Sequence, residues 1–447
     1  MSTTLYLGGI VHSPTDPLAT AMVVQDDRIA WTGSDAGAAA HRDGVDAVVQ
    51  LAGALVTPAF VDAHVHTTST GLALTGLDLG GCTSVADALD RVERHARELR
   101  GGVLLGHGWD ETSWPEQRPP TRDELDRASY GSVVYLSRVD VHSCLASSAL
   151  LAATPGVVGE PGYDPSGWLR QDAHHTVRAA AFDSITDMQR RTAQRTALRR
   201  AVELGIGTVH ELAGPDINGA DDLQALLRLA ADEPGPEVIA YWGAGLGPEG
   251  AMALGAHGAA GDYFVDGAIG SRTALLSQPY SDAATNGVQY LSAAQVRDHV
   301  VSCSRAGVQA GFHVIGDGAM AVVAAGFAEA AAEVGVASVR AAHHRLEHVE
   351  MLNAEQMTSL AQLGVVASVQ PVFDHLWGGD AGMYVTRLGP ERARHLNPYA
   401  AMVDAGITLA FGSDAPVTPL APWAAIRAAI AHQTPEHRID LAAAFYA

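Results

Sequence analysis

The chain has 447 residues, of which 47% are hydrophobic and 17% are charged, and its formal net charge is −22 at pH 7. This balance is typical of a globular protein with a large buried core, and the acidic charge excludes a surface for nucleic acids or anionic membranes. The N-terminus lacks the basic and apolar segments of a signal peptide, and no apolar run approaches the roughly 20 residues of a membrane span. We therefore expect a cytoplasmic protein without nucleic-acid or membrane partners.

The first segment is rich in β-forming residues. Three runs, at residues 4–11, 21–33 and 46–58, are separated by Gly and Asp turn residues. We predict a small antiparallel sheet in a β-sandwich subdomain that covers residues 1–56 and precedes the main domain.

From Thr57 onward, short apolar runs alternate with Ala-rich segments of helical length. The eight runs cover residues 57–66, 205–212, 237–245, 262–268, 307–317, 344–351, 364–373 and 406–416. Continuous apolar strands that alternate with helices are typical of a parallel (β/α)8 barrel, that is, a TIM-type α/β fold. We predict this barrel over residues 57–447. Polar residues gather at the carboxyl ends of the runs, where such barrels carry their chemistry.

Residues 67–200 interrupt the regular spacing. They contain two further strand-like runs, at 101–110 and 131–140, and helix-like segments at 88–100 and 192–205. We predict that most of this stretch is an insertion after the first barrel strand. Long inserted loops with their own secondary structure often shape a binding site.

His64 and His66 form a His-x-His pair at the end of the first barrel strand. Side chains at i and i+2 of a strand share one face, so both point into the barrel mouth. Neutral imidazoles are good ligands for Zn²⁺ or a similar ion. Alone, the pair is also explained by structural or surface histidines.

Three more candidates, His313, His348 and Asp414, end other predicted barrel strands. Five such side chains at one rim predict a metal site. Asp414 would contact the metal and serve the attacking water as general base, then general acid, while the metal lowers the pKa of water and polarises a carbonyl. For His348 two roles stay open: ligand of a second metal, or donor to the developing oxyanion.

Six ordered motifs carry a resemblance to a known family. They are PAFVDAHVH, DYFVDGAIGSRTALLSQPYSD, HVIGDGAM, RLEHVE, ASVQP and FGSDAPVTP. Together they resemble the amidohydrolase superfamily, specifically the YtcJ-like amidohydrolases of amidohydrolase family 3, from about residue 4 to about 430. The resemblance implies the barrel, a flanking β-sandwich, the insertion and one or two divalent metals. It also implies that His64, His66, His313, His348 and Asp414 are metal and catalytic residues.

Two departures from the family pattern matter. The family has a carboxylated lysine, which bridges two metals, four residues before an Asp-Gly pair, but here that position is Asp262. Aspartate ends several ångströms short at about 1.5 Å per bond, so Asp262 is a ligand only if the backbone or the metal shifts inward. We therefore favour one zinc ion over two. The family also continues beyond the eighth strand into strands of the β-sandwich, so we expect either an exposed edge or a homodimer that covers it.

Five residues are candidates for contact with a small-molecule substrate. They are Arg272, Trp109, Asp110, Glu211 and Gln370. Arg272 would grip a substrate carboxylate, with a salt bridge inside its own loop as the alternative, and Glu211 faces the mouth or braces it. Trp109 and Asp110 resemble the substrate-side segment of the family and would line the pocket from the insertion. Gln370, like Phe373, follows the seventh strand.

The predicted activity is hydrolysis of a C–N bond, as in an N-acyl or N-formyl amide, by metal-activated water. One alternative is a degenerate non-catalytic or regulatory relative that lost the bridging lysine and the C-terminal segment. Another is a C–O or deaminating hydrolase, which needs the same ligands and differs only in the pocket.

Overall fold

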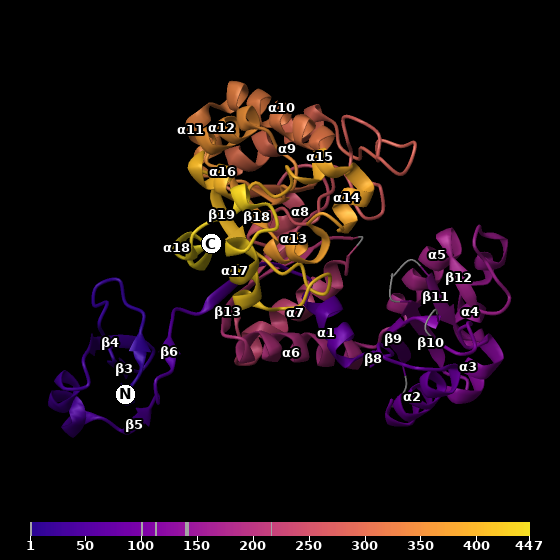
Figure 1. Ribbon diagram of the computed structural model, residues 1–447, viewed down its shortest axis with the longest axis horizontal. Coiled ribbons are helices and arrows are strands. Elements are labelled where there is room, and N and C mark those ends of the chain that lie inside the picture. Colours follow the sequence, from indigo (N-terminus) through magenta and orange to yellow (C-terminus); the bar gives the residue numbers. More distant parts are fainter. Residues whose placement is uncertain (1, 100–101, 112–113, 139–142, 216) are drawn as a thin grey trace. The chain divides into compact units, whose positions relative to one another are not determined.

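The computed structural model describes residues 2–99, 102–111, 114–138, 143–215 and 217–447. The chain forms two compact units, Met1–Phe60 and Val61–Ala447 (Figure 1). Among the described helices, none combines the length and the apolar character needed to cross a membrane.

The N-terminal unit holds a four-stranded sheet in the order β4-β3-β1-β5 and a separate β2-β6 pair. The elements are β1 (Thr3–Leu7), β2 (Ile10–Val11), β3 (Ala21–Gln25), β4 (Arg28–Gly33), a 3-10 helix (Gly37–Gly44), β5 (Ala47–Gln50) and β6 (Leu55–Val56). Strands β1 and β5 are parallel, as are β2 and β6. The predicted antiparallel sheet is therefore wrong in part, because the 3-10 helix acts as a crossover that returns the chain parallel to β1.

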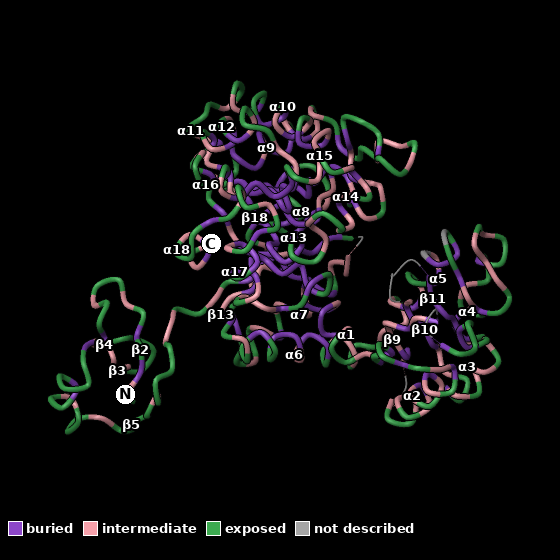
Figure 2. The backbone as a smooth tube through the Cα atoms, viewed as in Figure 1, coloured by how far each residue is buried: buried purple, intermediate pink, exposed green. Residues whose placement is uncertain are grey.

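The second unit contains an eight-stranded sheet in the order β19-β18-β17-β16-β15-β14-β13-β7. Its strands are β7 (Phe60–Val65), β13 (Ile206–Ala213), β14 (Glu237–Trp242), β15 (Gly258–Ala259), β16 (Gln309–Val314), β17 (Arg345–His348), β18 (Val366–Val369) and β19 (Thr408–Phe411). A parallel bridge between Val65 and Ala415 joins the end of the first strand to the segment that follows the last. The predicted (β/α)8 barrel is confirmed, and buried residues line its interior (Figure 2).

The fourth barrel strand lies elsewhere than predicted. The strand is β15, whereas the predicted run 262–268 is a loop that follows it. A Cβ at Gly258 would lie 2.8 Å from the Gln309 carbonyl oxygen and from the Tyr241 ring, so neighbouring strands leave no room for a side chain there. A two-residue Gly-Ala strand carries no apolar pattern, which is why the sequence pointed to the more hydrophobic residues that come next.

Helices surround the barrel sheet. They are α1 (Thr67–Thr75), α6 (Asp187–Glu203), α7 (Ala220–Asp232), α8 (Glu249–Leu254), α9 (Ala293–Ala306), α10 (Asp317–Val334), α11 (Val336–Ala341), α12 (Ala354–Gln362), α13 (Pro371–Trp377), α14 (Met383–Leu388), α15 (Pro390–Ala393), α16 (Tyr399–Asp404), α17 (Pro422–Ile430) and α18 (Leu441–Tyr446). Capping boxes start three of them, because the side chains of Thr186, Ser292 and Asn353 accept from the backbone three residues later, where a Gln reciprocates.

The insertion after β7 has its own five-stranded sheet in the order β12-β11-β10-β9-β8. Its elements are β8 (Leu77–Asp78), α2 (Val85–Glu98), β9 (Val103–Trp109), α3 (Arg122–Ala128), β10 (Val133–Arg138), β11 (Ser143–Ala146), α4 (Ser148–Ala153), β12 (Trp168–Arg170) and α5 (Gln171–Asp183). Residues 100, 101, 139 and 140 of the predicted segments 88–100, 101–110 and 131–140 lie outside the described residues. The inserted sheet runs from β8 to β12, inside the predicted range 67–200. Helices α1 and α6, which flank the insertion in the chain, pack against each other.

Trp109 lies in the core of this insertion. Its side chain is fully buried, its indole N–H donates to the Leu136 carbonyl at 2.9 Å, and its ring meets Trp168 edge to face. Asp110, next in the chain, forms an ion pair with Arg138 at 3.0 Å. The expectation that Trp109 faces a substrate is wrong, because an indole that is fully enclosed by its own sheet has no surface to offer.

We therefore expect Trp109→Ala to act on stability. Removing a buried indole should lower the free energy of unfolding by about 3–5 kcal/mol, measured by urea denaturation of the holoprotein. Trp423→Ala is the matched control, since that side chain is 39% exposed, and it should cost clearly less. Equal losses in the two variants would contradict the assignment of Trp109 to the core.

Candidate active site

The His-x-His pair and Asp414 meet where the barrel closes. His64 lies near the end of β7 and His66 is the N-terminal cap of α1. The Asp414 N–H donates to the His64 carbonyl at 2.7 Å, and the His66 N–H donates to the Ala415 carbonyl at 3.0 Å. A Cβ at Gly412 would lie 2.6 Å from that of His64, so only glycine lets the chain after β19 approach β7 this closely.

Four histidines each have one ring nitrogen bonded to an acceptor outside the cluster. The pairs are His64 Nδ1 with Glu347 Oε2 (2.9 Å), His66 Nδ1 with the Leu212 carbonyl (3.0 Å), His313 Nε2 with the Gly267 carbonyl (3.3 Å) and His348 Nδ1 with Gln370 Oε1 (2.8 Å). Each acceptor requires a hydrogen on the nitrogen that it contacts. The other nitrogen of a neutral ring then keeps its lone pair, which is the arrangement of metal-binding histidines.

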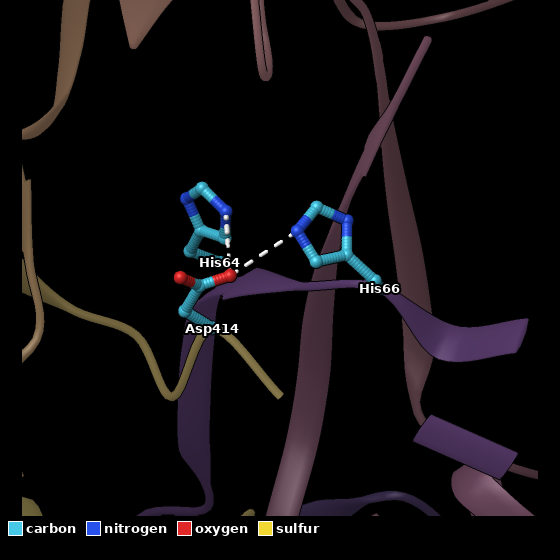
Figure 3. Close-up of side chains that lie close together, drawn as sticks. All are labelled: His64, His66 and Asp414. Carbon is cyan, nitrogen blue, oxygen red and sulfur yellow. Dashed lines mark ion pairs between the residues drawn. The ribbon is translucent and has the colours of Figure 1, made fainter. Parts of the chain in front are cut away.

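The free nitrogens converge on two carboxylates, which are buried with them. Asp414 Oδ1 lies 3.3 Å from His64 Nε2 and 3.1 Å from His66 Nε2, as Figure 3 shows. Asp262 Oδ2 lies 3.2 Å from His66 Nε2, and its Oδ1 lies 3.6 Å from both His64 Nε2 and His313 Nδ1. The structure thus brings together the predicted metal residues, with Asp262 among them.

The donor atoms fit a divalent cation. His64 Nε2, Asp262 Oδ1 and His313 Nδ1 are buried and have no hydrogen-bond partner among the described residues, which is costly unless a ligand satisfies them. Two groups of side chains place their ligand atoms within 4.8 Å of one another. They are His64, His66 and Asp414, and His64, Asp262 and His348.

The two carboxylates of the cluster, Asp262 and Asp414, are ionised and need positive charge beside them. Burial lowers the pKa of His64, but Asp414 and Glu347 outweigh this effect and raise it to about 10. Burial raises the pKa values of Asp262 and Asp414, but the neighbouring histidines hold both below the usual carboxyl range. Protons on the imidazoles thus balance two carboxylates, and a metal ion would displace those protons.

Asp262 reaches the cluster although aspartate is short. β15 ends at Ala259, and Asp262 lies in the loop that follows, where its carboxylate is 3.2–3.6 Å from ring nitrogens of His64, His66 and His313. The structure thus meets the condition under which we expected Asp262 to be a ligand, namely a backbone position close to the histidines. All 28 basic residues of the chain are arginine, so it has no lysine that could be carboxylated.

A family model described as the amidohydrolase family matches residues 47–447.

The chain belongs to this family.

Individual relatives agree with this assignment and with the predicted YtcJ-like resemblance. Putative amidohydrolase YtcJ of Bacillus subtilis is 27% identical, over 86% of this chain and 74% of its own length. N-substituted formamide deformylase of Arthrobacter pascens is 26% identical, over 93% and 81%. The crystal structure of an uncharacterized metal-dependent hydrolase from Pyrococcus furiosus has a TM-score of 0.80 and 26% identity, covering 99% of this chain and 93% of that one. The chain is thus an amidohydrolase-family, metal-dependent hydrolase.

Beneath the cluster, this amidohydrolase has a buried ion pair that sequence analysis missed. Arg345 and Glu347 share one face of β17 and lie 2.6 Å apart from Nε to Oε1. Burial alone would raise the pKa of Glu347, but Arg345 and His64 lower it to about 2. The ionised carboxylate holds the Nδ1–H of His64 and leaves Nε2 to face the cluster. Strand alternation around the RLEH motif was the available signal, since positions i and i+2 point into the barrel together.

We expect Glu347→Gln to weaken metal binding while the fold persists. Glutamine loses the negative charge that orients His64 and can also present an amide N–H to it. Loss of such an outer partner typically costs roughly 10–100-fold in metal affinity, which competition against a fluorescent chelator would measure. Glu355→Gln removes an equal charge from an exposed position of α12 and should leave affinity unchanged. Equal affinity in both variants would contradict this role of Glu347.

The residues predicted to touch substrate lie elsewhere in this amidohydrolase. Arg272 forms a two-pronged ion pair with Asp282, at 3.0 and 2.8 Å, so the alternative of a salt bridge within its loop is the correct one. Glu211 Oε2 accepts from the Thr67 N–H at 2.7 Å and braces the chain after His66. Gln370 orients His348, as described above.

A pocket of about 750 Å³ opens beside the cluster. His66, Asp262, His313, His348 and Asp414 line one part of it. Apolar and aromatic side chains line another part, namely Ile269, Ile315, Phe373, Trp377, Met383 and Tyr384. Glu350, just beyond β17, also lines it. Apart from Phe373, the apolar wall residues and Glu350 were not predicted, because they come from loops and short helices that have no barrel pattern.

Proposed function

We propose that this amidohydrolase cleaves a C–N bond of a small amide, of N-acyl or N-formyl type, with one zinc ion. The observation that carries the proposal is Asp414, which lies between the free nitrogens of His64 and His66 at the edge of the pocket. Nitrogen and carboxylate ligands suit Zn²⁺. The relative from Arthrobacter pascens, by its name an N-substituted formamide deformylase, supports an amide substrate.

His64 is the reason to propose one ion. Both candidate ligand groups include His64, and its Nδ1 already binds Glu347. Only Nε2 is left, and a histidine nitrogen binds one ion. The further ligands of that ion would come from His66, Asp414, Asp262 and His348.

The contacts of Asp414 and His348 indicate the role of each in the proposed reaction. A bound divalent cation supplies a Lewis acid that polarises the scissile carbonyl and lowers the pKa of water toward neutrality. The histidines keep Asp414 ionised, so its carboxylate takes a proton from the attacking water and passes it to the leaving nitrogen. His348 donates Nδ1–H to Gln370, so its Nε2 is an acceptor, which favours a ligand role over donation to an oxyanion. Burial and the charges of His313 and His64 lower its pKa to about 4, so the ring is neutral.

The test combines metal analysis with a matched substrate panel. Purified protein should contain about one zinc per chain, as for a mononuclear catalytic site, and chelation should abolish hydrolysis that added Zn²⁺ restores. The panel pairs N-formyl and N-acetyl derivatives of one amine with the ester of the corresponding alcohol. Turnover of the amides above the ester supports the proposal. Ester-only turnover favours a C–O hydrolase, and absence of both metal and rescue favours a non-catalytic relative.

A further inference from the structure

Glu350 is the one acidic wall residue on the barrel that the proposed chemistry leaves unused. Its side chain is 3% exposed, and its carbonyl accepts from the Asn397 N–H at 2.9 Å, which fixes the backbone. Its Oε2 is buried without a hydrogen-bond partner among the described residues. An unpartnered buried carboxylate is costly to keep, so this position calls for a ligand.

Glu350 has no direct ion-pair partner among the described residues. Arg178, which lines the same pocket, lies over the Phe182 ring, while Arg387 pairs with Asp282 and Arg345 with Glu347. Tyr384 lies beside the carboxylate, yet its hydroxyl also has no partner with hydrogen-bond geometry in the described chain. Two polar groups without a hydrogen-bond partner among the described residues therefore lie together in the pocket wall.

The position of Glu350 and Tyr384 in the pocket determines which part of a substrate they would contact. Glu350 and Tyr384 line the same pocket as Asp414 and His348. A substrate whose scissile amide lies at Asp414 would share this pocket with the apolar side chains of Phe373 and Trp377 and with Glu350. An ammonium or N–H donor at that distance from the amide would satisfy the carboxylate, whereas a substrate carboxylate there would meet a like charge.

We propose that Glu350 is the specificity determinant of the pocket and selects amides with a second, cationic or N–H donor group beyond an apolar spacer. This inference rests on the proposed function for the reaction, but the binding preference does not require turnover. Hydrogen bonds to charged groups are strong when buried, so a single carboxylate is sufficient to discriminate between otherwise identical substrates.

The test compares three N-formyl alkylamines of one chain length that end in ammonium, methyl or carboxylate. The metal-loaded wild type should prefer the ammonium form over the methyl form by about tenfold or more in kcat/KM, mainly through KM, as expected for a charged hydrogen bond. The carboxylate form should be the poorest. Glu350→Gln should bring the ammonium-to-methyl ratio close to one, while Glu355→Gln, on exposed α12, should keep the wild-type ratio.

Two further measurements distinguish a failure of the proposed subsite from a failure of the proposed reaction. Glu350→Asp keeps the charge and should retain a reduced ammonium preference, which tests the role if the Gln variant does not fold. Calorimetric binding of the matched diamine and monoamine repeats the comparison without turnover. Loss of the diamine preference in Glu350→Gln without any amide hydrolysis would support the subsite and overturn the proposed reaction. Amide hydrolysis with an unchanged ratio in Glu350→Gln would overturn the subsite alone.

Discussion

His64→Ala is expected to remove both the metal and the activity. His64 is fully buried, belongs to both candidate ligand groups, and is the one ligand that Glu347 orients. Alanine also leaves Glu347, Asp262 and Asp414 without their shared partner. The loss should therefore exceed the roughly 10–100-fold that an outer partner contributes. Elemental analysis of the dialysed protein and kcat/KM on an amide substrate would measure it.

A matched control separates this effect from general damage. His395 is exposed after α15, and His395→Ala should keep metal content and turnover at wild-type values. A circular dichroism melt of both variants reports the fold. Stoichiometric metal or wild-type turnover in His64→Ala would show that the metal site lies elsewhere.

Asp414→Asn should separate proton transfer from metal binding. Asparagine has the same shape and still offers a carbonyl oxygen to a cation, but it cannot accept a proton from water. General base catalysis contributes about 10²–10⁴-fold, so kcat should fall by that factor. KM should change little, since substrate binding relies on the pocket walls. Initial rates across a substrate range, with metal content measured on the same sample, test this.

Asp404→Asn is the control for Asp414, because Asp404 is exposed at the end of α16. It should retain the wild-type kcat. If Asp414→Asn kept the full kcat with its metal bound, the general base would have to be another group. If it lost the metal, Asp414 would act mainly as a ligand, and its role in proton transfer would need a different variant.

The sequence was most informative where a side-chain pattern depends on strand geometry. The i, i+2 spacing of His64 and His66 is enough to put both on one face, and strand ends in a barrel converge, so His313, His348 and Asp414 could be placed beside them. The same geometry could have placed Glu347 under the site, but its role depends on which nitrogen of His64 it contacts. Such a contact is set by side-chain rotation, which no spacing encodes.

Other residues could not be placed because two environments suit the same motif. A Trp-Asp pair fits a pocket wall or a subdomain core, and only the surrounding sheet decided that Trp109 is buried. Arg272 pairs equally well with a substrate or with Asp282. The role of Asp262 stayed conditional because β15 is too short and too small to predict, so the path of the backbone after it was unknown. Loop residues such as Glu350 have no periodicity at all.

The bonds that close the barrel bear on the order of events during folding. The hydrogen bonds that join His64 and His66 to the residues after β19 connect segments at opposite ends of the second unit. A chain emerging from the ribosome exposes the two histidines early, but Asp414 is translated hundreds of residues later. The complete ligand set therefore forms only when synthesis of the barrel is nearly finished. A metal ion that binds only the closed barrel should therefore stabilise it against opening between β7 and β19.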